Sequence, residues 1–423
     1  MFLKKNGYNG PYSMIINVLV ESFLKWKEQG ENTGYYTLYC DFATIRDAEA
    51  LYFYKNQQKL EDALELPTGL IIYGAPAQKR YVEDAYYKIN IDGSDIEQTG
   101  HTSFDSYLIT LTHHSKDSNS IVRIRDNDIE KLLDKAESSI TRTELENYLH
   151  GTSGSNETEN EFVQVNNVGQ GNWNEYHVGE RIPLVYDLGT DKSASCSEVR
   201  TLIEKHIPQY ESSGGTVAVI SHWDLDHYKC LLHMKPNEIR QFACFVVIET
   251  LPTATAKKAY DLIKSVPKVE VFAIPSFGKS TCKIPIQLPP VYQGLKLSIY
   301  SGVGSNRNSK GLIAVVKNSE YAAILSGDCL WSQFSHIMRS ETTTYSNRIC
   351  HLVVPHHGSG KDDTYNSFVL PSMWHYGEFA ISVGKNMFGH PSRGVMSYLK
   401  ALFAVKKIPR TDKTKQDIRL PMK

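Results

Sequence analysis

Apolar residues along the first 150 positions form short runs at two different spacings. Helical spacing predicts helices over 14–26 and 48–64. β-branched and aromatic runs predict three strands, over 35–42, 69–73 and 106–112. A charged amphipathic pattern predicts one more helix over 126–136, and Thr141 with Glu144 forms a capping-box start for another that ends near Leu149. This part of the chain is therefore expected to be a mixed α/β domain.

After residue 161 the pattern changes to short apolar strands, many of them followed directly by polar residues. The predicted strands lie at 162–166, 184–186, 217–220, 244–248, 269–273, 297–300, 312–316, 321–325, 351–354 and 379–383. An α/β scaffold exposes its functional groups at the carboxyl ends of its strands. The chemistry of this protein is therefore expected at those ends.

One break in composition divides the chain. Residues 151–161 read GTSGSNETENE and contain no apolar residue, so they predict a linker between a domain over 1–150 and a second domain over 162–405. Residues 406–423 carry seven basic and two acidic side chains and predict a basic C-terminal tail. A chain of 423 residues is long enough for two domains.

Composition narrows the class of protein. The formal net charge of −1 argues against a sequence-independent nucleic-acid coat protein, although it allows a local basic groove. The seven cysteines are odd in number and contain no C-x-x-C pair, so a disulfide framework and a zinc ribbon are unlikely, and a reducing cytoplasm is expected. The sequence contains no run of 18 apolar residues, so it predicts no membrane span.

The strongest chemical signal follows the strand predicted at 217–220. His222, Asp224, Asp226 and His227 are four potential metal ligands within six residues. Carboxylates and imidazoles so close together repel one another or lose solvation unless a cation organises them. A solvated turn that holds these residues by chance is the alternative.

This segment resembles the S-H-x-D-x-D-H signature of metallo-β-lactamase-fold hydrolases, and it is most similar to the ComEC-type hydrolase domain of bacterial DNA-uptake channels. Five further motifs are similar to that subgroup and occur in the same order: NVGQGN at 167–172, VYDLG at 185–189, LSGD at 325–328, VPHHGS at 354–359 and ISVGKNMFGHP at 381–391. The resemblance implies an α/β fold, a metallo-β-lactamase αββα sandwich preceded by the smaller mixed α/β N-terminal domain.

The resemblance also implies a metal centre. Its expected ligands are His222, Asp224, Asp226, His227, Asp328, His357 and His390. Asp328 is expected to bridge two divalent cations, and Asp226, His357 and His390 are the expected catalytic residues. The family commonly has a second histidine where Asp224 stands, and the oxygen-rich set moves the preference from Zn²⁺ towards Mn²⁺ or Mg²⁺. Two such ions would lower the pKa of a shared water.

Two departures from the family pattern affect the expected metal centre. Both acids of the first motif are asparagine here, Asn167 and Asn172. No histidine between His227 and Asp328 is a clear third ligand, because His233 is the only one in that interval and its apolar surroundings favour a core or helix-surface position. In the His356–His357 pair, His357 is the favoured ligand.

Substrate contacts are expected from Arg307, Lys310, Lys385, Asn386 and His356. The leading hypothesis is a metal-dependent phosphodiesterase or nuclease, acting on nucleic acid or nucleotides in a bacterial antiviral-defence or nucleic-acid-processing system with a possible partner protein. The alternatives are a small-molecule hydrolase such as a lactonase or lactamase, and a non-catalytic module that binds a partner.

Overall fold

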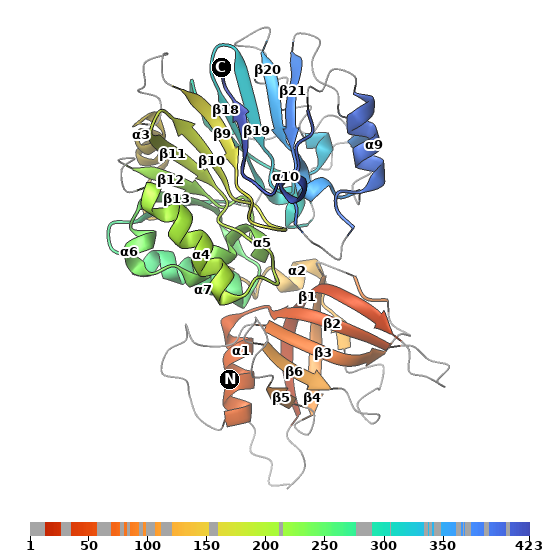
Figure 1. The fold of residues 1–423 in the computed structure, drawn as a ribbon. Coiled ribbons are helices and arrows are strands. Elements are labelled where there is room, and N and C mark those ends of the chain that lie inside the picture. The colour runs from red at the N-terminus through yellow and green to blue at the C-terminus, as the bar shows by residue number, and fades with distance from the viewer. Residues whose placement is uncertain are drawn as a thin grey trace. The chain divides into compact units, whose positions relative to one another are not determined.

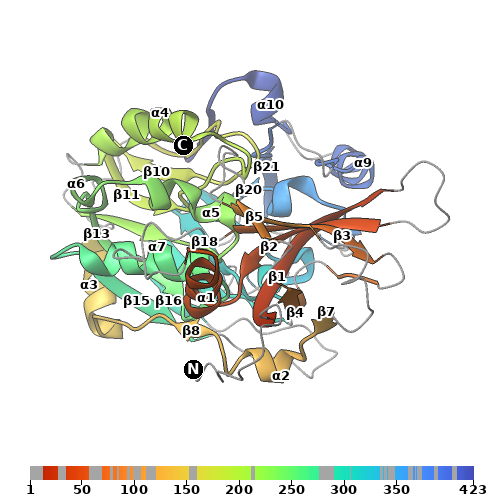
Figure 2. The same ribbon diagram turned by 90° about the horizontal axis from the view of Figure 1, so that it is seen from below.

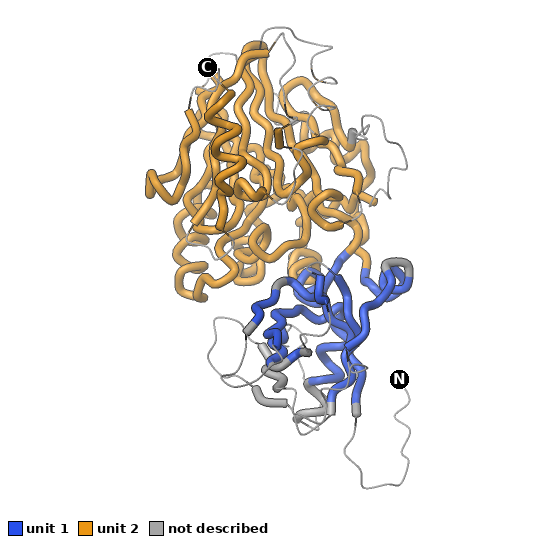
Figure 3. The backbone as a smooth tube through the Cα atoms, turned by 90° about the vertical axis from the view of Figure 1, so that its right-hand side faces the viewer, with its two compact units in different colours: residues 1–134, 251–258 blue, residues 135–250, 259–423 orange. Residues whose placement is uncertain are grey.

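The computed structural model forms two compact units, shown in Figure 3: residues 1–134 with 251–258, and residues 135–250 with 259–423. The described residues are 13–26, 35–56, 69–76, 80–82, 85–92, 96–98, 106–110, 121–151, 160–210, 215–275, 290–304, 306–333, 337, 341, 348–360, 365–366, 368, 374–384, 389–402 and 407–423. The division falls at 134/135, whereas composition predicted a linker at 151–161, of which 152–159 lie outside the described residues.

The first unit is built on a seven-stranded sheet with the order β5-β6-β3-β2-β1-β4-β7. Its strands are β1 (Ser13–Trp26), β2 (Tyr35–Phe42), β3 (Gly69–Pro76), β4 (Ala85–Asp92), β5 (Ile96–Gln98), β6 (Ser106–Thr110) and β7 (Ile121–Arg123). The helix predicted at 48–64 is α1 (Ile45–Asn56), and residues 57–64 lie outside the described part of the chain.

The helix predicted over 14–26 is wrong, because this segment is the long strand β1. Ile16, Val18 and Val20 alternate along it and are fully buried. Strand β1 pairs with both β2 and β4, so its centre is covered on both edges. Two further apolar residues, the exposed Ile15 and the buried Leu19, stand next to these positions, so the sequence lacks the polar alternation that distinguishes a strand from a helix.

The helix predicted over 126–136 is also wrong in extent. Only α2 (Asp126–Ile129) is helical, and Asp134–Lys135 forms the short strand β8. The predicted capping box is confirmed, because the Thr141 backbone N–H donates to Glu144 Oε2 and the Glu144 backbone N–H donates to the Thr141 hydroxyl at the start of α3 (Arg142–Gly151).

The second unit contains a seven-stranded sheet with the order β15-β13-β12-β11-β10-β9-β22. Its strands are β9 (Glu161–Val165), β10 (Asn174–Val178), β11 (Arg181–Tyr186), β12 (Thr216–Val219), β13 (Phe242–Ile248), β15 (Glu270–Ile274) and β22 (Ile418–Pro421). Strands β11, β12, β13 and β15 are parallel. The helices along this part of the chain are α4 (Cys196–His206), α5 (Leu225–Tyr228), α6 (Pro236–Ile239) and α7 (Ala254–Ser265), and β14 (Thr250–Leu251) precedes α7.

A six-stranded sheet, in the order β16 to β21, completes the second unit. Its strands are β16 (Pro290–Gln293), β17 (Leu297–Ser301), β18 (Leu312–Lys317), β19 (Tyr321–Leu325), β20 (Ile349–Val353) and β21 (His375–Ala380). Helix α9 (Arg393–Ala401) packs Val395 and Leu399 into the core of this sheet. In Figures 1 and 2, α6 and α9 lie on opposite sides of the second unit, with the two sheets between them.

All ten strands predicted after residue 161 overlap strands of the structure. The segment predicted as a basic tail contains α10 (Thr411–Thr414) and β22, which pairs with β9 and buries Leu420. Within the described part of the chain, no helix is both long and apolar enough to cross a membrane.

Candidate metal centre

Six of the seven residues predicted to bind metal, all except His390, come together at the carboxyl ends of strands from both sheets of the second unit. His222 and Asp224 follow β12, and the short helix α5 carries Asp226 and His227. Asp328 follows β19, and the His356–His357 pair lies in a tight turn after β20. Parallel pairing of β11 with β12 and of β19 with β20 brings these strand ends to common edges.

Two groups of ligand atoms form where these loops meet. His222, His227 and Asp328 make one group, and Asp226, His227 and His357 make the other; within each group the ligand atoms lie within 4.8 Å of one another. His227 Nε2 lies 3.2 Å from Asp328 Oδ1, and His357 Nε2 lies 3.3 Å from Asp226 Oδ2. Each group has the size and residue types of a metal site.

Hydrogen bonds on the far side of two rings fix their tautomers. His357 Nδ1 lies 2.8 Å from the Ser382 carbonyl oxygen, which can only accept. His227 Nδ1 lies 2.8 Å from Asp187 Oδ2. In the neutral form of both rings the proton is therefore on Nδ1, and the Nε2 lone pair faces the centre.

His222 is oriented through a hydroxyl group. Its Nδ1 lies 3.0 Å from Ser221 Oγ, and that hydroxyl donates to Asp187 Oδ2 at 2.9 Å. Since the Ser221 proton is used on Asp187, the His222 ring donates from Nδ1 and also keeps Nε2 unprotonated. Asp187 thus controls two of the three rings.

The atoms that face the centre make no hydrogen bonds. His222 Nε2, His227 Nε2, His357 Nε2 and Asp328 Oδ1 are all buried and without a hydrogen-bond partner. Burying a polar atom in this way costs free energy unless a ligand satisfies it. A set of imidazole nitrogens and carboxylate oxygens fits a divalent transition-metal ion.

Neighbouring carboxylates change the proton affinity of these rings. Burial lowers the pKa of His227, but Asp328 and Asp187 outweigh it and hold that pKa well above the usual value. Burial acts in the same direction on His357, but the nearby carboxylates of Asp226 and Asp328 outweigh it and raise its pKa above the usual value. Because protons and a metal ion compete for the same Nε2 atoms, metal affinity will increase with pH.

The turn that carries the two histidines has an uncommon backbone. His356 and His357 adopt φ angles of 50° and 51°, a left-handed region that costs about 1–3 kcal/mol for each such residue. The His356 N–H donates to the Gly327 carbonyl at 3.0 Å, which ties this turn to the loop of Asp328. The strained turn therefore places both rings beside that carboxylate.

Asp187 and Gly189 belong to the VYDLG motif, and the sequence predicted no role for either of them. Asp187 orients the His222 and His227 rings, as described above. A Cβ on Gly189 would lie 1.7 Å from the Asp226 carbonyl oxygen, so only glycine lets the ligand loop approach this closely. An acid followed by glycine two residues later, directly after a buried strand, was the signal that could have identified both.

Two cations contact the carboxylates of the centre. Arg307 Nη1 lies 2.9 Å from Asp224 Oδ1, so the residue predicted to bind phosphate pairs with a predicted ligand. Lys192 Nζ lies 3.6 Å from Asp226 Oδ1. Burial alone would raise the pKa of Asp224, but Arg307 and His222 hold it well below its usual value.

The remaining predicted residues lie further from the two groups or outside the described chain. The ring centroids of His390 and His356 are 5.6 Å apart, and His356 Nε2 lies 3.5 Å from Asp328 Oδ2. Lys310 ends a helical turn just before β18 and is half-buried. Lys385 and Asn386 lie outside the described residues.

A second cluster of histidines lies on the seven-stranded sheet, around the buried carboxylate Glu175. Glu175 Oε1 accepts from Tyr210 at 2.7 Å and lies 3.1 Å from His206 Nδ1. Its Oε2 lies 2.9 Å from His177 Nε2. Burial raises the pKa of Glu175, but its hydrogen bond with His177 and the close His206 ring outweigh burial and hold the pKa well below the usual value.

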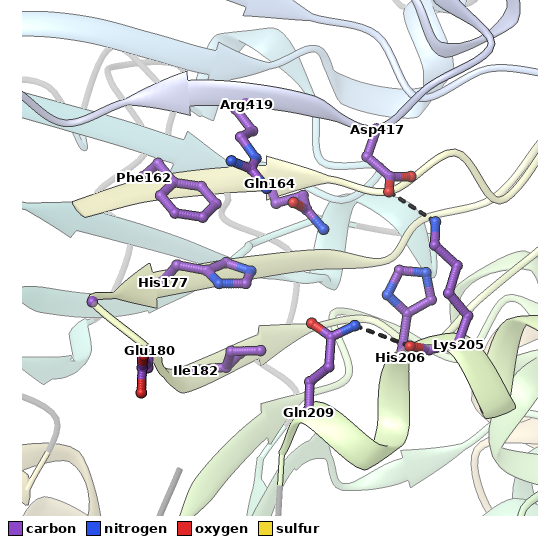
Figure 4. A pocket seen from close by; sticks show the side chains of 11 residues that line it. Phe162, Gln164, His177, Glu180, Ile182, Lys205, His206, Gln209, Asp417 and Arg419 are labelled. Atoms are coloured by element: carbon purple, nitrogen blue, oxygen red, sulfur yellow. Dashed lines mark hydrogen bonds and ion pairs between the residues drawn. The ribbon is translucent and has the colours of Figure 1, made fainter. Parts of the chain in front are cut away.

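Figure 4 shows the cavity of about 540 Å³ in front of this cluster. Phe162 stacks on the His177 ring, and the Arg419 guanidinium lies over the Phe162 ring, 4.8 Å from its centroid. Lys205 at the rim pairs with Asp417 at 2.8 Å. These charges are paired with one another, whereas the metal centre presents converging atoms without hydrogen bonds.

Comparison with known proteins adds little to this geometry. No family model matches the chain, and a search of the curated proteins finds no match. Two solved structures are similar at 8% identity, covering 94% of this chain and 75% of theirs: a mutant of the CmlA beta-hydroxylase (TM-score 0.35) and CmlA, a diiron beta-hydroxylase from Streptomyces venezuelae (TM-score 0.36). At such low TM-scores, this likeness carries no argument. What stands is a chain of mixed α/β architecture with several sheets, which brings together side chains suited to a metal ion.

Proposed function

We propose that this protein is a metal-dependent hydrolase of phosphodiesters in nucleic acid or nucleotides, built on the metallo-β-lactamase αββα sandwich of the ComEC type. The observation that carries the proposal is the convergence of three buried Nε2 atoms and Asp328 Oδ1, none of which makes a hydrogen bond. The six sequence motifs in the family's order support the fold.

A bound divalent cation would lower the pKa of a water molecule and polarise a phosphoryl oxygen. His222, Asp226, His227, Asp328 and His357 are the residues that would hold it. Asp187 accepts hydrogen bonds from His227 Nδ1 and from the Ser221 hydroxyl, so the Nε2 atoms of His227 and His222 are turned towards the centre.

His356 is suited to proton transfer rather than to ligation. Its side chain is 28% exposed, and its Nε2 faces Asp328. His390 lies beside it, so the two rings form the solvent side of the centre. A ring that contacts both solvent and the site can move a proton to a leaving oxygen.

A phosphodiester is the proposed substrate because the centre combines carboxylate ligands with fixed cations. Arg307 and Lys192 lie within ion-pair distance of the predicted ligands Asp224 and Asp226. Cationic side chains beside a metal centre favour an anionic substrate. The bacterial defence or nucleic-acid-processing setting, and the partner protein, rest on the resemblance and belong to the proposal.

The test is metal-dependent turnover on single-stranded DNA, double-stranded DNA, RNA, cyclic nucleotides, a chromogenic phosphodiester and lactones. The proposal expects cleavage of at least one phosphodiester, abolished by chelation and by His227→Ala. His375→Ala removes an exposed histidine and should leave turnover unchanged. Turnover of lactones alone would favour the small-molecule hydrolase, and no turnover on the whole panel would favour the partner-binding module.

A further inference from the structure

The Arg307 guanidinium occupies the side of the centre where His222 and Asp224 face each other. Its side chain is only 13% exposed, and Nη1 contacts Asp224 Oδ1 at 2.9 Å. The same Nη1 lies 3.4 Å from the Trp223 carbonyl oxygen. On the other side of the carboxylate, Asp224 Oδ2 lies 3.7 Å from His222 Nε2. A positive charge is thus built into the position beside Asp224.

The donor atoms limit how many ions the centre can hold. The two groups of ligands share His227, and its Nε2 has one lone pair and binds one ion. Once an ion takes His227, the other group keeps His222 and Asp328, or Asp226 and His357. A third donor beside His222 would have to be Asp224, which already pairs with Arg307. Two protein donors fall short of the three found in catalytic zinc sites.

The balance of charge also indicates a single divalent cation. Asp187, Asp224, Asp226 and Asp328 are all buried and carry four negative charges when ionised. Arg307 and Lys192 contact two of them and offset two charges. Buried charges are stable only when they are compensated, and one divalent cation compensates the remaining two.

We propose that the centre holds a single divalent cation bound through His227, and that the Arg307 guanidinium takes the place of a second cation beside Asp224. Asp224 is then a partner of Arg307 and not a metal ligand. The inference departs from the two ions expected from the sequence. It rests on the metal centre of the proposed function but not on its substrate.

This arrangement gives Arg307 a role that a second ion has in two-metal hydrolases. A guanidinium carries five donors in a fixed fork, so a bond to Asp224 through Nη1 is compatible with another to a phosphoryl oxygen. A fixed cation beside the metal would stabilise charge that develops on the attacked group.

The experiment counts ions on the full-length chain. Wild type, Arg307→Met, Arg307→Lys and Arg200→Met are stripped with a chelator, titrated with Mn²⁺ by calorimetry, and analysed by elemental analysis and electron paramagnetic resonance. Arg200→Met is the matched control, because it removes another partly buried arginine–carboxylate pair, with Glu238. Circular dichroism checks that each variant is folded.

We expect one Mn²⁺ per chain with an uncoupled spectrum for wild type, Arg307→Lys and Arg200→Met. Arg307→Met leaves Asp224 without its cation and should bind a second Mn²⁺, with a spin-coupled spectrum. Two tightly bound, spin-coupled ions in the wild type would overturn the inference, and so would an Arg307→Met variant that still binds one. If Arg307→Met does not fold, the wild-type count still decides. A wild type that binds no ion would overturn the metal centre itself, whereas one bound ion without phosphodiester turnover would overturn only the proposed substrate.

Discussion

Glu175 and Asp328 are both buried carboxylates beside histidine rings in the same compact unit, yet their surroundings differ. Both oxygens of Glu175 accept hydrogen bonds, from Tyr210 and Asn166 on one side and from His177 on the other. Asp328 Oδ1 makes none, although His227 Nε2 lies 3.2 Å away.

The contrast shows how a structural cluster is distinguished from a binding site. Residue types do not separate the two clusters, since each combines carboxylates with imidazoles. Neither ring nitrogen of His206 near Glu175 makes a hydrogen bond, but no group of three convergent donors forms around it among the described residues. Convergence of several unsatisfied atoms, rather than the presence of histidine, marks the metal centre.

The largest effect is expected from removing two ligands at once. Asp226→Ala combined with His227→Ala should abolish metal binding and turnover while the fold is retained, because these side chains sit on a short helix at the edge of the sheet. Elemental analysis, turnover and circular dichroism measure the three properties. Unchanged metal content in the double variant would show that the ions bind elsewhere.

A smaller effect is expected from Asp187→Asn, which leaves every proposed ligand in place. The amide can no longer hold Ser221 and the His227 ring as the carboxylate does. Loss of such a supporting bond typically costs about 10–100-fold in metal affinity. Calorimetric titration measures it, with Asp412→Asn, whose carboxylate pairs with Arg410, as the control. Equal affinities for the two variants would contradict the role of Asp187.

Glu175→Gln should have the opposite pattern of effects. The amide oxygen and nitrogen cannot satisfy all the donors that now meet the carboxylate, so the free energy of unfolding should fall by about 1–3 kcal/mol. Metal content should not change. Glu180→Gln, at the rim of the same cavity and exposed, is the matched control. A Glu175→Gln protein that keeps its stability but loses metal would reverse the assignment of the two clusters.

The smallest effect is expected on the pH dependence of the free energy of unfolding. His177 and His206 hold the pKa of Glu175 below its usual value, although burial opposes them. An unfolded glutamate takes up its proton near about pH 4.3. The unfolding free energy that Glu175 contributes is therefore present above that pH and lost as the pH falls below it. Urea unfolding of wild type and Glu175→Gln should converge in acid, and a constant difference would contradict this.

The metal centre was predictable because most of its residues follow buried strands directly. His222 to His227, Asp328 and His357 are adjacent to apolar runs whose ends the sheet brings together. Asp187 follows such a strand as well, but its role depends on hydrogen bonds that a sequence does not display. The pairing of Arg307 with Asp224 joins side chains far apart in the chain, so no local pattern could indicate it.

Elements whose polarity reflects tertiary structure were missed. Strand β10 reads NEYHV, and its polar residues include Glu175 and His177, which are buried only because the cluster surrounds them. Strand β22 lies in a basic segment, where alternate burial of Ile418 and Leu420 is a weak signal. The ten strands predicted in the second unit share an apolar run that depends on no distant partner.

Anomalous diffraction from crystals of the 423-residue chain grown with Mn²⁺ tests directly whether one ion binds at the metal centre and none at Glu175. We expect one anomalous peak in each chain, in contact with His227 Nε2 and Asp328 Oδ1, and no peak at the Glu175 cluster. A centre without an anomalous peak at saturating Mn²⁺, or a peak at Glu175 instead, would contradict this expectation.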